Sequence, residues 1–298
     1  MDIAKDVREF LMTRRAKITP EQVGLPPGRR RRVPGLRREE VAQLAGVSIE
    51  YYTQIERGNV AGVSDDVLHS VARALRLAEE ETAHLFDLVR AAGTTTSAAR
   101  SPRRDDRKIP DGVQPLIDGM VDSPAIVLNG HLDIVAANPL GRTLYAPVFA
   151  RATGVPNLVR FIFFDPHADE VFPEWNTAAD DAVALLRVEA AHSPHSTVVT
   201  GLVGELATRS EEFRTRWAAH NVKAHQHGVK QFRHPDVGDL SLTYNVFDIT
   251  GAGGLSLVGY TAEPQSPSEQ ALRLLTIVAA TDRAPAGPAT DTPSTATE

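Results

Sequence analysis

Apolar side chains recur at helical spacing through the first hundred residues, separated by short polar turns. Residues 2–17 place Ile3, Val7, Phe10 and Leu11 on one face of a predicted helix. Segments 64–77 and 79–92 show the same spacing, and residues 37–58 predict two short helices around a turn at Gly46. The five expected helices indicate an all-α N-terminal domain.

The pattern after residue 111 predicts strands at both ends of the segment and helices between them. Short apolar runs at 125–128 and 132–136 flank Asn-Gly-His, which is a strong hairpin signal. Helices are expected at 113–121, 139–146, 157–164, 168–191, 198–219 and 266–280, and strands at 231–234, 240–249 and 255–263. An antiparallel sheet with helices on one side follows, so the C-terminal fold class is α+β.

Stretches poor in apolar residues divide the chain. Residues 94–111 are polar and charged, and 282–298 are rich in Ala, Pro and Thr, so we expect a linker and a disordered tail. The predicted domains are therefore 1–93 and 112–281.

Composition narrows the setting of the protein. The absence of cysteine excludes a disulfide framework and thiolate metal sites and suits a reducing cytoplasm. We see no signal peptide and no run of the roughly 20 apolar residues that a membrane span needs. The net charge of −6 is uneven, since residues 14–38 carry nine basic side chains against Glu21 alone. Such a patch is suited to phosphates.

Residues 37–58 fit a helix-turn-helix. The inner faces are predicted to hold Val41, Leu44 and Ala45 on the first helix and Val47, Tyr52 and Ile55 on the second. Gly46 can take the positive φ that the turn needs, and Ser48 can cap the second helix. An ordinary helical hairpin is the alternative, but the adjacent basic segment favours DNA binding.

The predicted DNA-binding residues are Arg29, Arg30, Arg31, Arg32, Arg37, Arg38, Gln43, Ser48, Ile49, Glu50, Thr53, Gln54 and Arg57. The four-arginine run is expected to reach the backbone or the minor groove. Gln54 can pair with adenine, Glu50 with cytosine, and Ile49 can touch a thymine methyl. The alternative for Glu50 and Glu56 is helix pairing with Arg37 or Arg38, which we favour for Glu56.

Several motifs in one order resemble a known family. They include Arg-Arg-Val-Pro-Gly-Leu-Arg-Arg-Glu-Glu-Val-Ala-Gln-Leu-Ala-Gly-Val-Ser (31–48), Asn157-Leu158-Val159-Arg160, Phe164-Asp165-Pro166 and His234-Pro235-Asp236-Val237-Gly238. The chain resembles transcription regulators of the xenobiotic-response-element helix-turn-helix class with an MmyB-like ligand-binding domain. The resemblance implies a PAS-like C-terminal fold and a small-molecule or fatty-acid-like effector. Gln54 stands where the family more often has arginine.

The predicted ligand-binding residues are Arg160, Phe161, Phe164, Trp175, Trp217 and Tyr244. Arg160 is a lone charge in an apolar helix and could hold an anionic head group. The alternative is a surface arginine paired with Asp165, since arginine is seldom buried alone. The aromatic residues could equally be ordinary core.

Other chemistry finds little support in the sequence. The histidine pairs 192/195 and 225/227 lack carboxylates at a metal-ligand spacing, so we expect no metal and no cofactor. Nucleophile-elbow, phosphate-loop and dinucleotide-binding glycine motifs are missing, so we expect no enzyme.

The sequence thus predicts a cytoplasmic, ligand-responsive regulator that binds double-stranded DNA as a homodimer. One alternative is a DNA-bound scaffold whose C-terminal domain serves only dimerisation or protein contacts. A second is an enzyme fused to a DNA-binding domain.

Overall fold

The computed structural model describes residues 2–26, 31, 33, 35–93, 108–221 and 226–283. The chain divides into two compact units that interleave in sequence. The first comprises residues 1–106, 129–133 and 157–226, and the second comprises 107–128, 134–156 and 227–298. The predicted linker therefore falls largely outside the described residues, as do residues 284–298 of the predicted tail.

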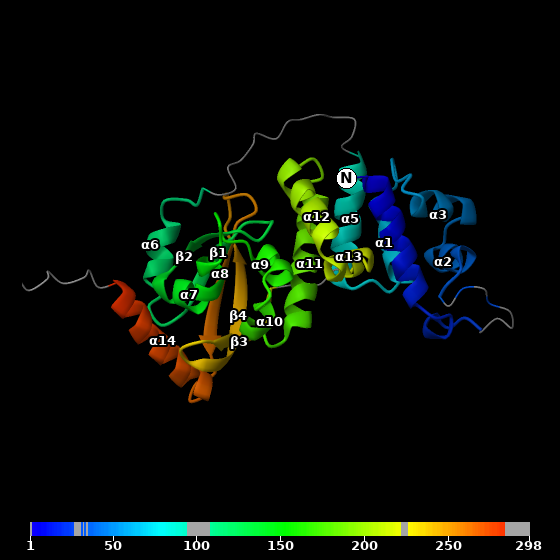
Figure 1. The fold of residues 1–298 in the computed structure, drawn as a ribbon. Helices are drawn as coiled ribbons and strands as arrows, with labels where there is room; N and C mark the ends of the chain where they lie inside the picture. Colours follow the sequence, from blue (N-terminus) through cyan, green and yellow to red (C-terminus); the bar gives the residue numbers. More distant parts are fainter. Residues whose placement is uncertain are drawn as a thin grey trace, which may run out of the picture. The chain divides into compact units, whose positions relative to one another are not determined.

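The N-terminal part of the first unit is helical, as predicted (Figure 1). Its elements are α1 (Ile3–Lys17), the 3-10 helix η1 (Glu21–Val23), α2 (Arg38–Ala45), α3 (Ile49–Glu56), α4 (Asp65–Ala74) and α5 (Glu79–Gly93). The side chain of Asp2 caps α1 by accepting from the Lys5 amide at 3.3 Å. Asp65, Asp66 and the three glutamates of 79–81 begin α4 and α5, where the helix dipole favours negative charge.

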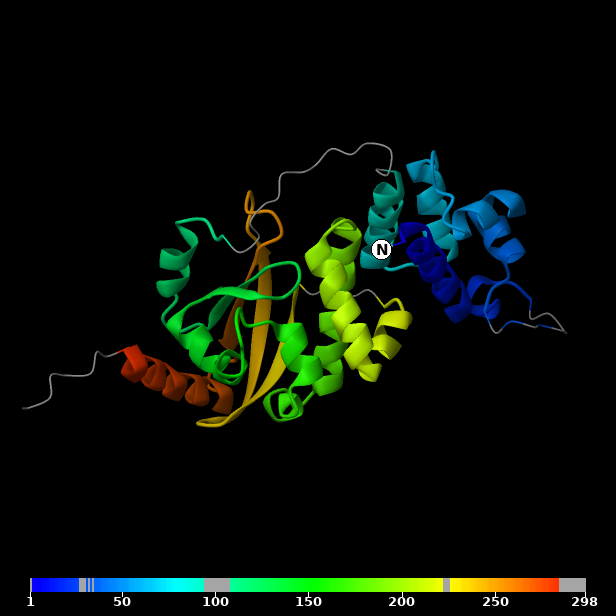
Figure 2. The ribbon, with the colours of Figure 1, turned by 45° about the horizontal axis from the view of Figure 1, so that its top comes forward.

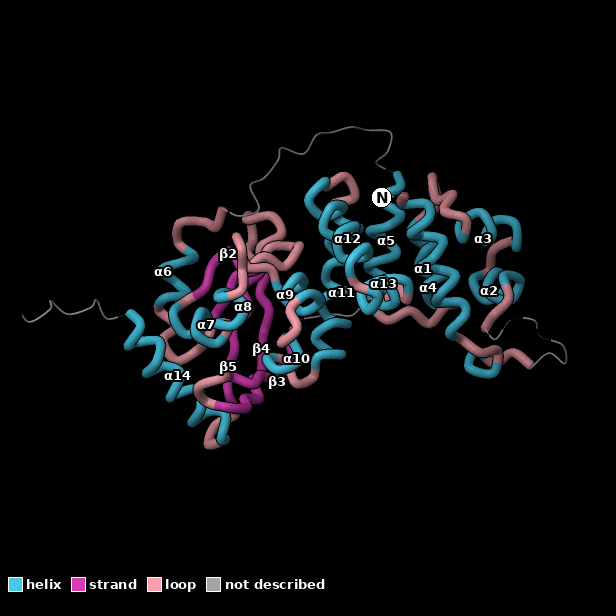
Figure 3. Tube along the Cα trace, in the orientation of Figure 1, coloured by secondary structure: helices cyan, strands magenta, loops and turns pink. Residues whose placement is uncertain are grey.

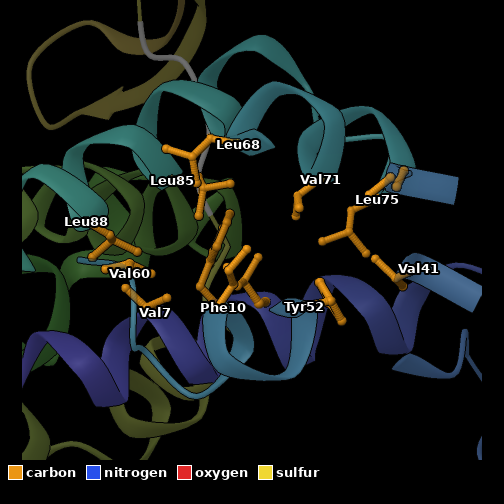
Figure 4. Close-up of a cluster of buried hydrophobic side chains, with 14 of the residues drawn as sticks. Val7, Phe10, Val41, Tyr52, Val60, Leu68, Val71, Leu75, Leu85 and Leu88 are labelled. Carbon is orange, nitrogen blue, oxygen red and sulfur yellow. The ribbon is translucent and has the colours of Figure 1, made fainter. Parts of the chain in front are cut away.

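These helices enclose one apolar core. Figure 4 shows side chains of α1, α4 and α5 pointing into it, among them Phe10, Leu68 and Leu85. Tyr52 and Ile55 of α3 and Val41 of α2 are buried in the same cluster, as the sequence pattern predicts. Ala191, far along the chain, also belongs to this core.

Two positions differ from the predicted faces. Leu44 is 37% exposed, because Val41, Ala42 and Ala45 already fill the inner side of the short helix α2. Arg14 of α1 is charged and yet buried, with its Nε atom 2.8 Å from Glu81 Oε1 and its Nη2 atom donating to the His220 carbonyl.

Five more helices among the described residues belong to the first unit, where α11 packs on α5. Figure 2 draws these five helices in green to yellow. They are α9 (Leu158–Phe164), α10 (Ala168–Val171), α11 (Trp175–His192), α12 (Thr197–Arg209) and α13 (Glu211–Ala218). The prediction of single helices over 168–191 and 198–219 is wrong. Pro173 forces the preceding residue, Phe172, out of the helical region, and Ser210 adopts an extended conformation to cap α13 through the Phe213 amide.

The second unit is built on a five-stranded antiparallel sheet in the order β2-β1-β5-β4-β3 (Figure 3). The strands are β1 (Ala125–Leu128), β2 (Ile134–Ala137), β3 (His227–His234), β4 (Gly238–Asp248) and β5 (Ser256–Ala262). Side chains alternate along β4, with Leu240, Leu242 and Tyr244 buried. β2 begins two residues later than expected, because Leu132 takes a positive φ in the hairpin turn.

Helices flank this sheet and complete the α+β arrangement. They are α6 (Val113–Asp118), α7 (Pro139–Leu144), α8 (Ala146–Ala150) and α14 (Pro267–Arg283). α14 packs on α7, β4 and β5, and α7 also contacts β1 and β2. The side chain of Asn138 caps α7 by accepting a hydrogen bond from the Gly141 amide. Pro139 occupies the first helical position, where the predicted helix begins. None of the helices in the described part of the chain is long and apolar enough to cross a membrane.

Candidate nucleic-acid interface and sensor region

The turn between α2 and α3 has the geometry that the sequence predicts. Gly46 adopts a φ of +69° and ends α2, and the Ser48 hydroxyl accepts from the Tyr51 amide at 3.1 Å. Tyr52 and Ile55 anchor the inner side of α3 in the core. The outer side of α3 is therefore held firmly toward solvent.

The residues predicted to read bases lie on that outer side. Ser48, Ile49, Glu50, Gln54 and Arg57 are exposed, Thr53 is half-buried, and Gln43 is exposed on α2. The Gln54 Oε1 atom accepts from Asn59 Nδ2 at 2.7 Å. Asn59 was not among the predicted residues, and its place just after α3 was the available signal. An amide held in this way presents its remaining donors and acceptors in a fixed direction.

The described arginines of the 29–38 stretch pair with carboxylates. Arg31 forms two hydrogen bonds with Glu40, at 2.7 and 2.8 Å, and donates to the Gly35 carbonyl. This pairing lowers the pKa of the Glu40 carboxyl. Arg37 pairs with Glu39 at 3.1 Å. Arg29, Arg30 and Arg32 lie outside the described residues.

Glu56 acts in helix pairing, and the preferred interpretation for this residue is confirmed. Its Oε1 atom accepts from Arg38 Nε at 2.6 Å and its Oε2 atom from Arg15 Nε at 2.7 Å. Burial works to raise the pKa of Glu56, but the two arginines outweigh it and the pKa is lowered. The sequence indicated Arg38 but not Arg15, since Arg15 precedes Glu56 by 41 residues.

Arg160 lies at the surface of the first unit. Its Nη2 atom is 2.9 Å from Glu205 Oε2, and Glu205 also pairs with Arg209 at 3.0 Å. Arg160 is thus an ion-paired surface arginine, as in the alternative interpretation, but its partner is Glu205 on α12 and not Asp165. A ligand carboxylate at Arg160 would have to compete with Glu205.

The six predicted ligand-binding residues are divided between the two units. Phe161 packs edge-on against Phe172, and Phe164 lies under Arg209. Trp175 contacts Phe163 and donates to the Ile162 carbonyl at 2.9 Å. Trp217 stacks on Phe213 and under Arg187. These four belong to the helices of the first unit, whereas Tyr244 belongs to the sheet of the second.

Tyr244 is part of an aromatic cluster that the sequence did not indicate. Tyr145 and Tyr260 share a hydrogen bond between their hydroxyls at 2.6 Å, and Phe232 packs against both rings. Burial raises the pKa of both tyrosines, so they stay protonated. Tyr145 lies between α7 and α8, whereas Phe232, Tyr244 and Tyr260 lie on β3, β4 and β5. Only the register of the sheet brings these rings together.

A shallow groove of about 660 Å³ lies along α14, lined by Asp122, Arg273, Thr276, Ile277, Ala280 and Thr281. It contains none of the predicted ligand-binding residues.

The described residues hold no group of three histidines or carboxylates placed to bind a metal. His192 instead pairs with Asp87 at 2.9 Å, and His225 lies outside the described residues.

Comparison with known families assigns both parts of the chain. Residues 109–275 match the family described as MmyB-like transcription regulator ligand binding domain. Residues 28–85 match a family described as a helix-turn-helix domain. No curated protein matched the chain.

Proposed function

We propose that this chain, which belongs to the transcription regulators with an MmyB-like ligand-binding domain, changes its occupancy of operator DNA when an amphiphilic effector binds it. It carries a DNA-binding domain and a ligand-binding domain, and both families are regulatory rather than enzymatic. Its proposed setting is the cytoplasm, and its proposed operator is palindromic and bound by a homodimer.

The DNA-binding part of the proposal rests on α3, which has one buried side and one exposed side. We propose α3 as the recognition helix. Its inner residues are fully buried, while Ile49, Glu50 and Gln54 project outward. A helix-turn-helix places such outward residues against base edges in the major groove. Gln54, oriented by Asn59, is the proposed reader of an adenine.

The experiment is selection of bound sequences from a pool of random duplexes by the full chain. We expect one enriched motif with two half-sites. Gln54→Ala should relax one position in each half-site by about 1–3 kcal/mol while leaving the others unchanged. Equal losses on the enriched and on random duplexes would overturn the proposed role of Gln54. Sedimentation with and without the duplex reports whether a dimer binds.

The effector part rests on the matched family and on the strand order, which supports a PAS-like sensor. The proposed effector is fatty-acid-like, with Arg160 holding its carboxylate in place of Glu205. Native mass spectrometry of the gently purified chain tests this directly. A bound lipid lost in Arg160→Gln but kept in Arg209→Gln supports the role of Arg160. A chain that carries no lipid and takes up none from a fatty-acid mixture favours a scaffold instead.

A further inference from the structure

The residue that follows α13 has an unusual backbone. His220 adopts a φ of +50° and is only 2% exposed. The left-handed region is unfavourable for a residue with a Cβ atom, and such conformations persist when surrounding contacts hold them. A left-handed residue commonly ends a helix, and at His220 the buried ring adds contacts that hold this conformation.

Both ring nitrogens of His220 have partners. The Nδ1 atom lies 2.9 Å from Arg187 Nη1, and the Nε2 atom lies 3.0 Å from Glu9 Oε2. Arginine can only donate, so Nδ1 accepts and the neutral ring carries its proton on Nε2, from which it donates to Glu9. Burial and Arg187 lower the pKa of His220 to about 4, which agrees with a neutral ring.

The carbonyl groups at the end of α13 are held as well. Arg14 of α1 donates to the His220 carbonyl, and Arg187 of α11 donates to the Trp217 carbonyl. Lys17 of α1 donates to Asn221 Oδ1 at 2.7 Å. The last carbonyls of a helix have no partner within it, so these donors fix the end of α13 on α1 and α11.

α1 in turn holds the proposed recognition helix. Arg15 follows Arg14 in the sequence and donates to Glu56, the last residue of α3, which is 1% exposed. Two adjacent arginines of α1 therefore contact different parts of the chain. Arg14 reaches α13, which belongs to the matched ligand-binding region, and Arg15 reaches α3, which belongs to the DNA-binding domain.

We propose that His220 is a positioning residue that transmits the arrangement of α11 and α13 through α1 to the recognition helix. This inference rests on the proposed DNA binding by α3 and specifies how that site is regulated. Linkage requires the effect to be reciprocal, so DNA bound at α3 must change the stability of the His220 contacts.

The test uses the full chain and the duplex enriched by the wild-type protein. His220→Gly keeps the backbone conformation, which glycine adopts freely, and removes only the ring contacts. We expect its Kd for the duplex to rise about fivefold or more. Glu9→Ala should raise the Kd in the same direction, and the double variant should be no worse than His220→Gly alone, because His220→Gly already removes the contact with Glu9. Glu9→Gln keeps an acceptor for Nε2 and should restore wild-type affinity.

The control is Arg233→Ala, which removes an exposed ion pair with Asp239 between β3 and β4, away from α1, α11 and α13. Its Kd should stay within about twofold of wild type. Hydrogen exchange gives a readout that a loss of stability alone would not move. Adding the duplex should slow exchange of the 214–221 amides about threefold in the wild type and leave it unchanged in His220→Gly.

The outcomes separate the two proposals. A wild-type chain that enriches no duplex overturns the proposed function and this inference with it. A wild-type chain that binds, with His220→Gly binding equally or more tightly, or with unchanged exchange at 214–221, overturns this inference alone. Circular dichroism and a thermal melt of each variant show that it is folded.

Discussion

Arg15 donates a hydrogen bond from Nε to the Oε2 atom of Glu56 at 2.7 Å and joins the first helix of the chain to the end of α3. Arg38 completes the site on the other carboxylate oxygen. The carboxylate is almost wholly removed from water, whereas the Arg38 side chain remains 43% exposed. The two arginines thus differ sharply in how much they depend on Glu56.

Glu56→Ala should lower the free energy of unfolding by about 3 kcal/mol, because it leaves the Arg15 side chain, which is only 12% exposed, without its carboxylate partner. Arg38→Ala should cost less than about 1 kcal/mol, as exposed ion pairs do. Urea unfolding followed by circular dichroism measures both. Equal losses for the two variants would contradict the assigned difference in burial.

Asn59→Ala should weaken recognition of the same base as Gln54→Ala, by less than about 1 kcal/mol. The variant keeps the reading amide and removes only the group that orients it. Titration of the selected duplex and of its single-base variants by fluorescence anisotropy measures the change. A loss at a different base, or an equal loss on all duplexes, would show that Asn59 acts in another way.

Acidification should destabilise the first unit between pH 6.5 and 4. Burial, with Arg187 as the next cause, lowers the pKa of His84 to about 3 and that of His220 to about 4. Both rings are neutral at pH 7, and below pH 6.5 the unfolded chain binds protons that the folded chain excludes. The expected loss is roughly 1 kcal/mol per histidine at pH 5.5.

The measurement is urea unfolding at pH 7.5 and 5.5. Several charged groups surround the two rings, namely Arg14 and Glu9 of α1, Glu81 of α5 and Arg187 of α11. The ring nitrogens of His84 have no hydrogen-bond partner among the described residues, so His84→Leu should fold well at pH 7.5. This variant should lose less stability than the wild type between the two pH values. An equal loss would place the acid sensitivity elsewhere.

Gly58→Ala should be more destabilising than Gly46→Ala, although both glycines have positive φ. A Cβ atom at Gly46 meets open space, so the cost is the backbone strain of about 1 kcal/mol. At Gly58 it would lie 2.4 Å from the Ala4 carbonyl oxygen of α1, and backbone must move. Thermal melts of the two variants give the comparison, and equal shifts would contradict the tight contact between α1 and the end of α3.

Local patterns predicted the elements well where the relevant contacts are near in sequence. The spacing of Val41, Tyr52 and Ile55 gave the core side of the two short helices, and Asn138-Pro139 gave the start of α7. Long helices were predicted across Phe172 and Ser210, because apolar residues continue at helical spacing past both breaks. Proline and a capping serine override that spacing, since they act on backbone hydrogen bonds rather than on burial.

The candidate sites divide in the same way. The exposure of Gln54 and Glu50 follows from the 3.6-residue repeat of the helix, so it can be predicted from the sequence of α3 alone. The contacts of His220 with Glu9 and Arg14 span more than 200 residues and have no signature in a single sequence. The partner of Arg160 was misjudged for the same reason, because Glu205 is 45 residues away and Asp165 only five.

The order of the strands has a consequence for how the chain is made. β1 pairs with β5, residue Ala125 opposite Gly259, and β4 and β3 join the sheet only through β5. During synthesis the hairpin of β1 and β2 leaves the ribosome more than a hundred residues before its neighbour exists. The helices of residues 2–93 leave the ribosome first, and the apolar edge of β1 then waits unpaired until β5 is made. The sheet is therefore the part of the nascent chain most in need of a chaperone.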